Sequence, residues 1–188
     1  MPSILTVCRA NVCRSPLAAH LLAGGLAANS GLADLTVTSA GLAPAVGTSA
    51  CRLASAGIPS LAAHEAAVLS ADAVRAATLV LTMERSQRGK VAALVPGAQL
   101  KVFTLSEAAD LAGEAVHRGV TGLGADEIVA QLHALRGQVT VLPPRRRGVA
   151  GDDIADGHGA GVLAHRRAVR AVRSESTRLV SALEALVG

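Results

Sequence analysis

Ten residues near the start of the chain include side-chain types that covalent phosphate chemistry requires. Residues 7–16 read VCRANVCRSP, in which five residues separate Cys8 from Arg14. A cysteine thiolate is a strong nucleophile, and an arginine guanidinium binds two phosphate oxygens through its planar fork. The spacing alone is weak evidence, because chance would give it roughly one time in four in a chain so rich in arginine. The residues on either side of the segment therefore decide how it is interpreted.

The flanking sequence predicts that this segment joins a strand to a helix. The apolar run Ile4–Val7 ends at Cys8, and Pro16 suits the first turn of a helix over Leu17–Ala28. A loop between a strand end and a helix N-terminus points backbone N–H groups and the positive helix dipole at an anion. Such a field binds phosphate and stabilises a thiolate. We therefore predict Cys8 as the nucleophile, with Ser15 donating a hydrogen bond to its sulfur. The predicted phosphate-binding residues are Arg9, Ala10, Asn11, Val12, Cys13, Arg14 and Ser15.

The other two cysteines are given lesser roles. Cys13 either pairs reversibly with Cys8 under oxidation or packs in the interior, and the sequence leaves both possibilities open. Cys51 is expected to be a core residue of a helix over Thr48–Ala56. We predict no metal site and no cofactor, because no histidine or further cysteine lies at a zinc-like spacing from Cys8 and Cys13.

The rest of the chain alternates strand and helix patterns, which predicts a single α/β domain over residues 1–188. We expect three layers, with a four-stranded parallel sheet flanked by helices and the site at the carboxyl end of the first strand. A Pro- and Arg-rich basic connection around residues 137–151 contains Arg145–Arg147. The remaining expected strands are Leu35–Thr38, Thr78–Thr82 and Leu100–Leu105, and the remaining expected helices begin near Ser70 or span Glu84–Leu94, Ala125–Leu135 and Val162–Val187.

Composition excludes several classes of protein. The 188 residues carry 18 basic and 14 acidic side chains, a net charge of +4 that suits anionic substrates. Aromatic residues make up 1% of the chain, so a nucleic-acid partner that stacks its bases is not expected. The sequence shows no apolar run long enough to span a membrane and no secretory leader. Three cysteines, an odd number, do not suggest a secreted disulfide framework, so we expect a cytoplasmic protein.

These residues closely resemble the low-molecular-weight protein tyrosine phosphatase family, whose loop reads Cys-x-Gly-Asn-x-Cys-Arg-Ser-Pro. Further resemblance lies in Ser39-Ala40-Gly41, in His64 and in the apolar stretch Leu79–Glu84, which ends in Met and an acidic residue. The resemblance implies a phosphomonoester hydrolase that forms a cysteinyl-phosphate and acts on a phosphorylated protein or a small phosphomonoester. It also implies that Asn11, Ser15, Ser39 and His64 brace the phosphate loop.

The resemblance also implies a general acid. The family has Asp-x-x-Asp-Pro-aromatic before its last helix, and residues 153–158 here read DIADGH, which implies Asp156. Asp152 and Asp153 are competing candidates. The chain departs from the family pattern at four positions. Ala10 replaces a Gly and is expected to strain the phosphate loop, and Gly157 replaces a Pro and is expected to loosen the acid loop. His158 replaces an aromatic residue and Ala67 replaces an Arg, so the sequence leaves open whether phosphotyrosine is the natural substrate.

Two alternative functions remain open from the sequence. Related arsenate reductases share the loop but use further cysteines, and none follows Cys51, so a reductase here would need a small external thiol. A phosphate- or phosphoprotein-binding relative without turnover would fit the altered acid loop. Family members that act on phosphoarginine have a Thr before the second loop cysteine, and Val12 argues against that substrate.

Overall fold

Four parallel strands form the centre of the computed structural model, which describes residues 1–28, 31–138 and 151–188. The strands lie in the order β2-β1-β3-β4, so β1 and β3 are the central pair. The α/β class with a four-stranded parallel sheet is thereby confirmed. Their bounds are Ser3–Cys8 for β1, Thr36–Gly41 for β2, Leu79–Thr82 for β3 and Val102–Thr104 for β4.

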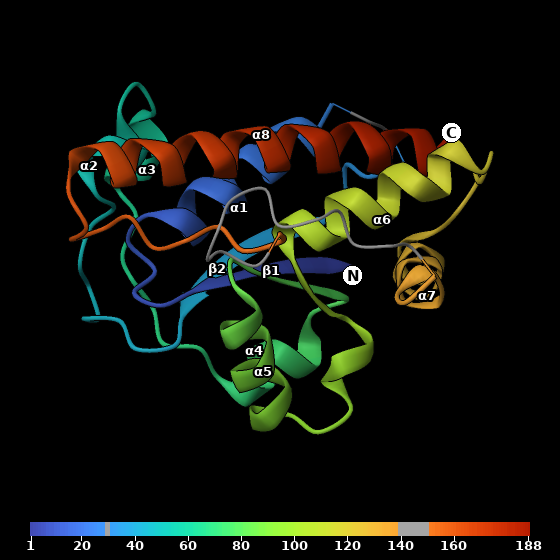
Figure 1. Ribbon diagram of the computed structural model, residues 1–188, viewed down its shortest axis with the longest axis horizontal. Helices are drawn as coiled ribbons and strands as arrows, with labels where there is room; N and C mark the ends of the chain where they lie inside the picture. Colours follow the sequence, from blue (N-terminus) through green and yellow to red (C-terminus); the bar gives the residue numbers. More distant parts are fainter. Residues whose placement is uncertain (29–30, 139–150) are drawn as a thin grey trace.

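Helices cover both faces of the sheet, which gives the predicted three layers (Figure 1). Alternate residues of β1 belong to different cores: Ile4 packs in one apolar cluster, and Leu5 and Val7 pack in the other. The first cluster includes α1, α6 and α8, which cover one face, and the second includes α4 and α5 on the opposite face. Their bounds are Arg14–Leu26 for α1, Ala71–Ala76 for α4, Arg85–Leu94 for α5, Leu105–His117 for α6 and Val162–Val187 for α8.

The prediction for the segment around Cys51 is partly wrong. The expected helix over Thr48–Ala56 is reduced to α2 (Arg52–Ser55), followed by α3 (Pro59–Ala62), so Cys51 precedes the helix. Two short turns replace one helix because Gly57 adopts a left-handed backbone, with φ of 74°, and Pro59 then starts α3.

Beyond β4 the structure contains one helix, α6, that we did not predict from the sequence. Thr104 caps α6 and accepts a hydrogen bond from the backbone N–H of Glu107, whose carboxylate accepts one from the Thr104 N–H. The two later helices agree with the prediction, α7 spanning Ala125–Leu135 and α8 spanning Val162–Val187. A 3₁₀ turn, η1, covers Ala98–Leu100. Most of the predicted basic connection around residues 137–151, including Arg145–Arg147, lies outside the described residues.

In the parts of the chain that the structure describes, we find no helix both long enough and apolar enough to cross a membrane. The long helix α8 is amphipathic: its buried residues include Val169, Val172, Leu179 and Leu183, while arginines lie between them. It packs along α1 and α6 (Figure 1). The start of α8 follows directly on residues 151–161, so this packing positions the loop that carries the candidate acid.

Candidate active site

Cys8 is the last residue of β1, and its sulfur lies at the floor of the phosphate loop, defined here as residues 8–15. The Cys8 Sγ is 3.0 Å from the Ser15 Oγ, and the Asn11 backbone N–H donates to the same sulfur at 3.3 Å. Arg14 begins α1, so the loop joins a strand end to a helix N-terminus as expected. The Ser15 hydroxyl and the Asn11 N–H therefore both contact one buried sulfur at the centre of the loop.

Asn11 is the central brace of this loop. It is fully buried, and its backbone adopts the left-handed region with φ of 54°, which asparagine tolerates better than most residues. Its amide nitrogen donates to Ser15 Oγ at 3.0 Å and to Ser39 Oγ at 2.9 Å, and its amide oxygen accepts from the Ala67 N–H at 2.9 Å. His64 Nε2 donates to the Asn11 carbonyl at 2.7 Å. The structure thus brings together Asn11, Ser15, Ser39 and His64, which sequence reasoning had grouped only through the resemblance.

The phosphate loop lies directly against Gly41 at the end of β2, where a side chain would be crowded. A Cβ on Gly41 would be 3.0 Å from the Asn11 Cβ and 3.1 Å from both the Ala10 carbonyl carbon and the Arg9 oxygen. Among the described residues other than glycine, Asn11 is the one with a positive φ. Ala10 therefore needs no left-handed backbone, and the strain expected from the missing glycine is not found there.

Arg14 connects three parts of the chain through one buried guanidinium, whose side chain is 3% exposed. Its Nη1 donates to a carboxylate oxygen of Glu84 and, at 2.8 Å, to the carbonyl of Ile154. Its Nη2 is 2.9 Å from the Asp156 carboxylate. Sequence reasoning used Glu84 only as a marker of the resemblance and missed this contact. An acidic residue just after the third parallel strand was the available signal, because that strand end lies beside the site.

The three candidate acids lie in the acid loop, defined here as residues 152–158, and differ in their contacts and burial. Asp156 has a side chain 34% exposed, contacts Arg14, and accepts a hydrogen bond from the His158 N–H at 3.0 Å. Asp152 is buried, and its carboxylate lies 2.5 Å from the Nε of Arg85. Asp153 accepts from the Arg85 N–H at 2.7 Å, and burial raises the pKa of its carboxyl. Of the three, Asp156 is therefore the one placed beside the phosphate loop.

Gly157 is buried against the start of α8. A Cβ there would lie 2.5 Å from the Ala164 carbonyl oxygen and 2.6 Å from the His165 Cα, closer than real Cβ atoms approach. The sequence comparison led us to expect a looser loop at this glycine. The structure shows instead that the absence of a side chain lets the loop pack closely against helix backbone.

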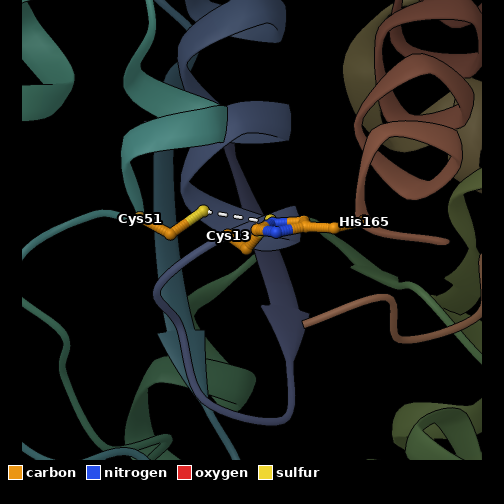
Figure 2. A group of neighbouring side chains, drawn as sticks. All are labelled: Cys13, Cys51 and His165. Carbon is orange, nitrogen blue, oxygen red and sulfur yellow. Dashed lines mark hydrogen bonds between the residues drawn. The ribbon is translucent and has the colours of Figure 1, made fainter. Parts of the chain in front are cut away.

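A second group of reactive side chains lies beside the phosphate loop (Figure 2). The Cys13 Sγ is 3.0 Å from the His165 Nε2, and the Cys51 Sγ is 3.3 Å from the same nitrogen. Hydrogen bonding to Cys13 lowers the pKa of Cys51 to about 5, whereas that of Cys13 is raised by the same interaction and by burial. Cys51 is therefore not the plain core residue we expected. Sequence reasoning missed the group because its members are far apart in sequence, 114 residues separating Cys51 from His165.

Comparison with known proteins agrees with this geometry. The model of the family described as low molecular weight phosphotyrosine protein phosphatase matches residues 3–117. Ptp of Acinetobacter johnsonii, a low molecular weight protein-tyrosine-phosphatase, is 34% identical over 108 residues, which cover 55% of this chain and 71% of the relative. Wzb of Salmonella typhi, named in the same way, is 40% identical over 104 residues, covering 53% and 66%.

Solved structures match a larger share of the chain than the sequence relatives do. AmsI, a tyrosine phosphatase from Erwinia amylovora, superposes with a TM-score of 0.64 at 24% identity, covering 96% of this chain and 91% of that one. The YwlE arginine phosphatase from Geobacillus stearothermophilus gives a TM-score of 0.63 at 26% identity, covering 97% and 93%. Since the family model alone spans more than half of the sequence, the chain belongs to the low molecular weight phosphotyrosine protein phosphatase family and is a phosphatase of that type.

Proposed function

We propose that this phosphatase hydrolyses phosphomonoesters on proteins with Cys8 as nucleophile, Arg14 as phosphate ligand and Asp156 as general acid. The single observation that carries the assignment is the position of Arg14. Its guanidinium belongs to the loop that surrounds the Cys8 sulfur and also contacts the Asp156 carboxylate, 2.9 Å away. Nucleophile, anion ligand and acid are therefore within reach of one phosphate group.

In the first chemical step the Cys8 thiolate attacks phosphorus, so that a sulfur–phosphorus bond forms as the ester oxygen–phosphorus bond breaks. The backbone N–H groups of residues 9–15 and the Arg14 guanidinium stabilise the charge on the three remaining oxygens. Asp156, protonated at this stage, gives its proton to the departing oxygen. The substrate phosphate replaces the Asp156 carboxylate as a partner of Arg14, which frees the acid for this transfer.

The second step regenerates the enzyme. The Asp156 carboxylate accepts a proton from water, whose oxygen attacks phosphorus as the sulfur–phosphorus bond breaks. Ser15 supports this departure because its hydroxyl, 3.0 Å from the Cys8 sulfur, donates to the thiolate as it forms. Inorganic phosphate then leaves.

Phosphotyrosine is the first substrate to test, because the relatives Ptp and Wzb are named tyrosine phosphatases. The neighbour YwlE is named an arginine phosphatase, and we regard Val12 as evidence against that substrate here. His158 takes the place of the family's aromatic residue and packs edge-on against His165, with ring centroids 5.1 Å apart. We place the protein in the cytoplasm because three cysteines, an odd number, do not suggest a secreted disulfide framework.

The test compares hydrolysis of an aryl phosphate, a phosphotyrosine peptide and a phosphoarginine peptide by the wild type, Cys8→Ser and the control Cys51→Ser. We expect Cys8→Ser to lose at least roughly 10³-fold in kcat while still binding inorganic phosphate, because backbone amides make the site. Cys51→Ser should retain turnover. Retained turnover in Cys8→Ser together with loss in Cys13→Ser would show that the nucleophile is misassigned. Arsenate-dependent consumption of a small thiol without phosphate ester hydrolysis would identify a reductase instead.

A further inference from the structure

Three potential metal ligands from three separate elements converge beside the phosphate loop. Cys13 precedes α1, Cys51 precedes α2 and His165 lies in the first turn of α8. Figure 2 shows the two thiols and the imidazole directed toward one another. All three ligand atoms lie within 4.8 Å of one another. No step proposed for phosphate hydrolysis uses these side chains.

The spacing of these atoms is close to that of a tetrahedral zinc site. Bonds of about 2.3 Å to sulfur and 2.0–2.1 Å to nitrogen at tetrahedral angles separate ligand atoms by about 3.5–3.8 Å. The sulfur–nitrogen distances here are 3.0 and 3.3 Å, so each sulfur needs to move only a few tenths of an ångström away from the imidazole nitrogen. Thiolate and imidazole ligands together favour zinc over magnesium or calcium.

We propose that Cys13, Cys51 and His165 bind a Zn²⁺ ion through two thiolates and the His165 Nε2, with water in the fourth position. On binding, each thiol that is still protonated releases its proton to solvent, and the sulfur–zinc bond takes its place. No oxidant or reductant is involved. The site is separate from the nucleophile, because the Cys8 sulfur is directed at Ser15 and Asn11.

The backbone already holds the ligands near their bound positions. The Cys51 N–H donates to the Val12 carbonyl at 2.6 Å, which fixes Cys51 beside the loop residue that precedes Cys13. His165 is anchored in α8 by its N–H bond to the Gly161 carbonyl at 3.0 Å. Cys13 is buried, whereas Cys51 and His165 are partly exposed, so an ion can enter from solvent on their side.

Zinc bound here would tie the phosphate loop to the first turn of α8, against which Gly157 of the acid loop packs. The ion would therefore stabilise the arrangement of the two halves of the active site without occupying the phosphate position. We expect Cys8 to remain open to alkylation and the melting temperature to rise with free zinc. Neither Cys8 alkylation nor the melting temperature depends on turnover. Zinc binding can therefore be disproved while the phosphatase mechanism stands, and the mechanism can be disproved while zinc binding stands.

The experiment titrates the full-length, reduced, metal-free protein with Co²⁺ and then with Zn²⁺. Tetrahedral cobalt with thiolate ligands absorbs strongly in the visible, and zinc should displace it at one equivalent per chain. Cys51→Ser and His165→Ala should each weaken zinc binding by more than about 100-fold, since loss of a supporting partner alone costs roughly 10–100-fold. Cys8→Ser and His117→Ala, an exposed histidine on α6, should bind like the wild type.

Each other outcome overturns the proposal. Equal affinity in the wild type, Cys51→Ser and His165→Ala would place the ion elsewhere, and loss of binding in Cys8→Ser would place it on the nucleophile. Absence of the tetrahedral spectrum, together with a Cys13–Cys51 disulfide that forms in air at the same rate with and without zinc, would identify an oxidisable thiol pair instead. Circular dichroism of each variant excludes misfolding as the cause, and the partial exposure of Cys51 and His165 favours variants that fold.

Discussion

The phosphate loop and the acid loop differ in how far along the chain their hydrogen-bond partners lie. The phosphate loop is fixed by hydrogen bonds to segments that follow it closely in the chain, such as the Leu42 N–H to the Cys8 carbonyl at 3.0 Å and the Ala43 N–H to the Arg9 carbonyl at 2.8 Å. The acid loop takes its hydrogen bonds from more distant segments: its Ile154 N–H donates to the Met83 carbonyl at 2.8 Å, and the Ile154 carbonyl accepts from Arg14 at 2.8 Å. Its Gly157 packs against the start of α8, the helix that follows it in the chain.

The sequence comparison and the structure comparison cover different lengths of the chain. The family model matches residues 3–117, which contain the whole phosphate loop and its braces, whereas the structural neighbours also cover the acid loop and α8. The acid loop therefore lies outside the part of the chain that the family model matches. Arg14 joins the two regions, and changes to it should be the most damaging.

After loss of the nucleophile itself, Arg14→Lys should cause the largest loss of activity. Lysine keeps the charge but lacks the planar fork, so it cannot contact Glu84 and the substrate phosphate together. We expect kcat/KM to fall by at least about 10³-fold, since one lost oxyanion donor already costs about 10²–10³-fold. Steady-state kinetics on an aryl phosphate measures this. A loss below tenfold would mean that backbone amides alone carry the phosphate.

Asp156→Asn should have the next largest effect, because it removes the acid while leaving the phosphate loop intact. A general acid contributes about 10²–10⁴-fold, and we expect about 10²-fold or more for a tyrosyl leaving group. Nitrophenolate leaves without protonation, so its release should slow much less. The measurement is the slope of log kcat against leaving-group pKa for the wild type, Asp156→Asn and Asp153→Asn. If Asp153→Asn alone changes the slope, the acid is Asp153; if neither does, turnover needs no acid from this loop.

The phosphate loop could be predicted from the sequence because its nucleophile and its phosphate ligand lie within a few residues of each other. The structure contains the strand that we predicted to end at Cys8. It also contains the helix that we predicted to follow the loop, with Arg14 and Pro16 in its first turn. The long helices α7 and α8 were also predictable, since their apolar periodicity is uninterrupted.

The features that sequence reasoning missed depend on tertiary packing. Glu84 becomes a partner of Arg14 only because β3 lies beside β1, and His165 reaches Cys13 only because α8 crosses over α1. The start of α6 could have been predicted from the sequence, because Thr104 and Glu107 have the spacing of a capping box. We instead predicted a longer strand from the apolar run before Thr104. Ser39 and His64 carried no chemical signal of their own, and only the resemblance singled them out.

Gly157→Ala tests whether packing alone positions the acid. The added methyl group would collide with the backbone of Ala164 and His165, which cannot move without shifting α8. Overpacking of this kind typically costs about 1–3 kcal/mol, and we expect a lower melting temperature and roughly tenfold slower release of a tyrosyl group. The control is Gly113→Ala on α6, where a Cβ meets nothing within 4 Å. Alkylation of Cys8 at the wild-type rate in Gly157→Ala would show that the phosphate loop is undisturbed, whereas an unchanged kcat would mean that the acid loop tolerates displacement.

Asp153→Asn should have the smallest effect, a pH-dependent change in stability with turnover nearly intact. Burial raises the pKa of the Asp153 carboxyl, so the native state holds a proton more tightly than the unfolded chain does. The resulting stabilisation is complete below the usual aspartate pKa of about 4 and is lost as the pH rises through the raised value. Near neutral pH the partly buried, ionised carboxylate therefore lowers the free energy of unfolding. Asparagine carries no charge, and its side-chain oxygen can still accept a hydrogen bond from the Arg85 N–H. We expect the variant to melt slightly higher than the wild type at about pH 7, and the difference to disappear by about pH 3. Thermal melts across this range measure it. A lower melting temperature at neutral pH would mean that the charge of Asp153 at the start of α5 contributes more than its burial costs.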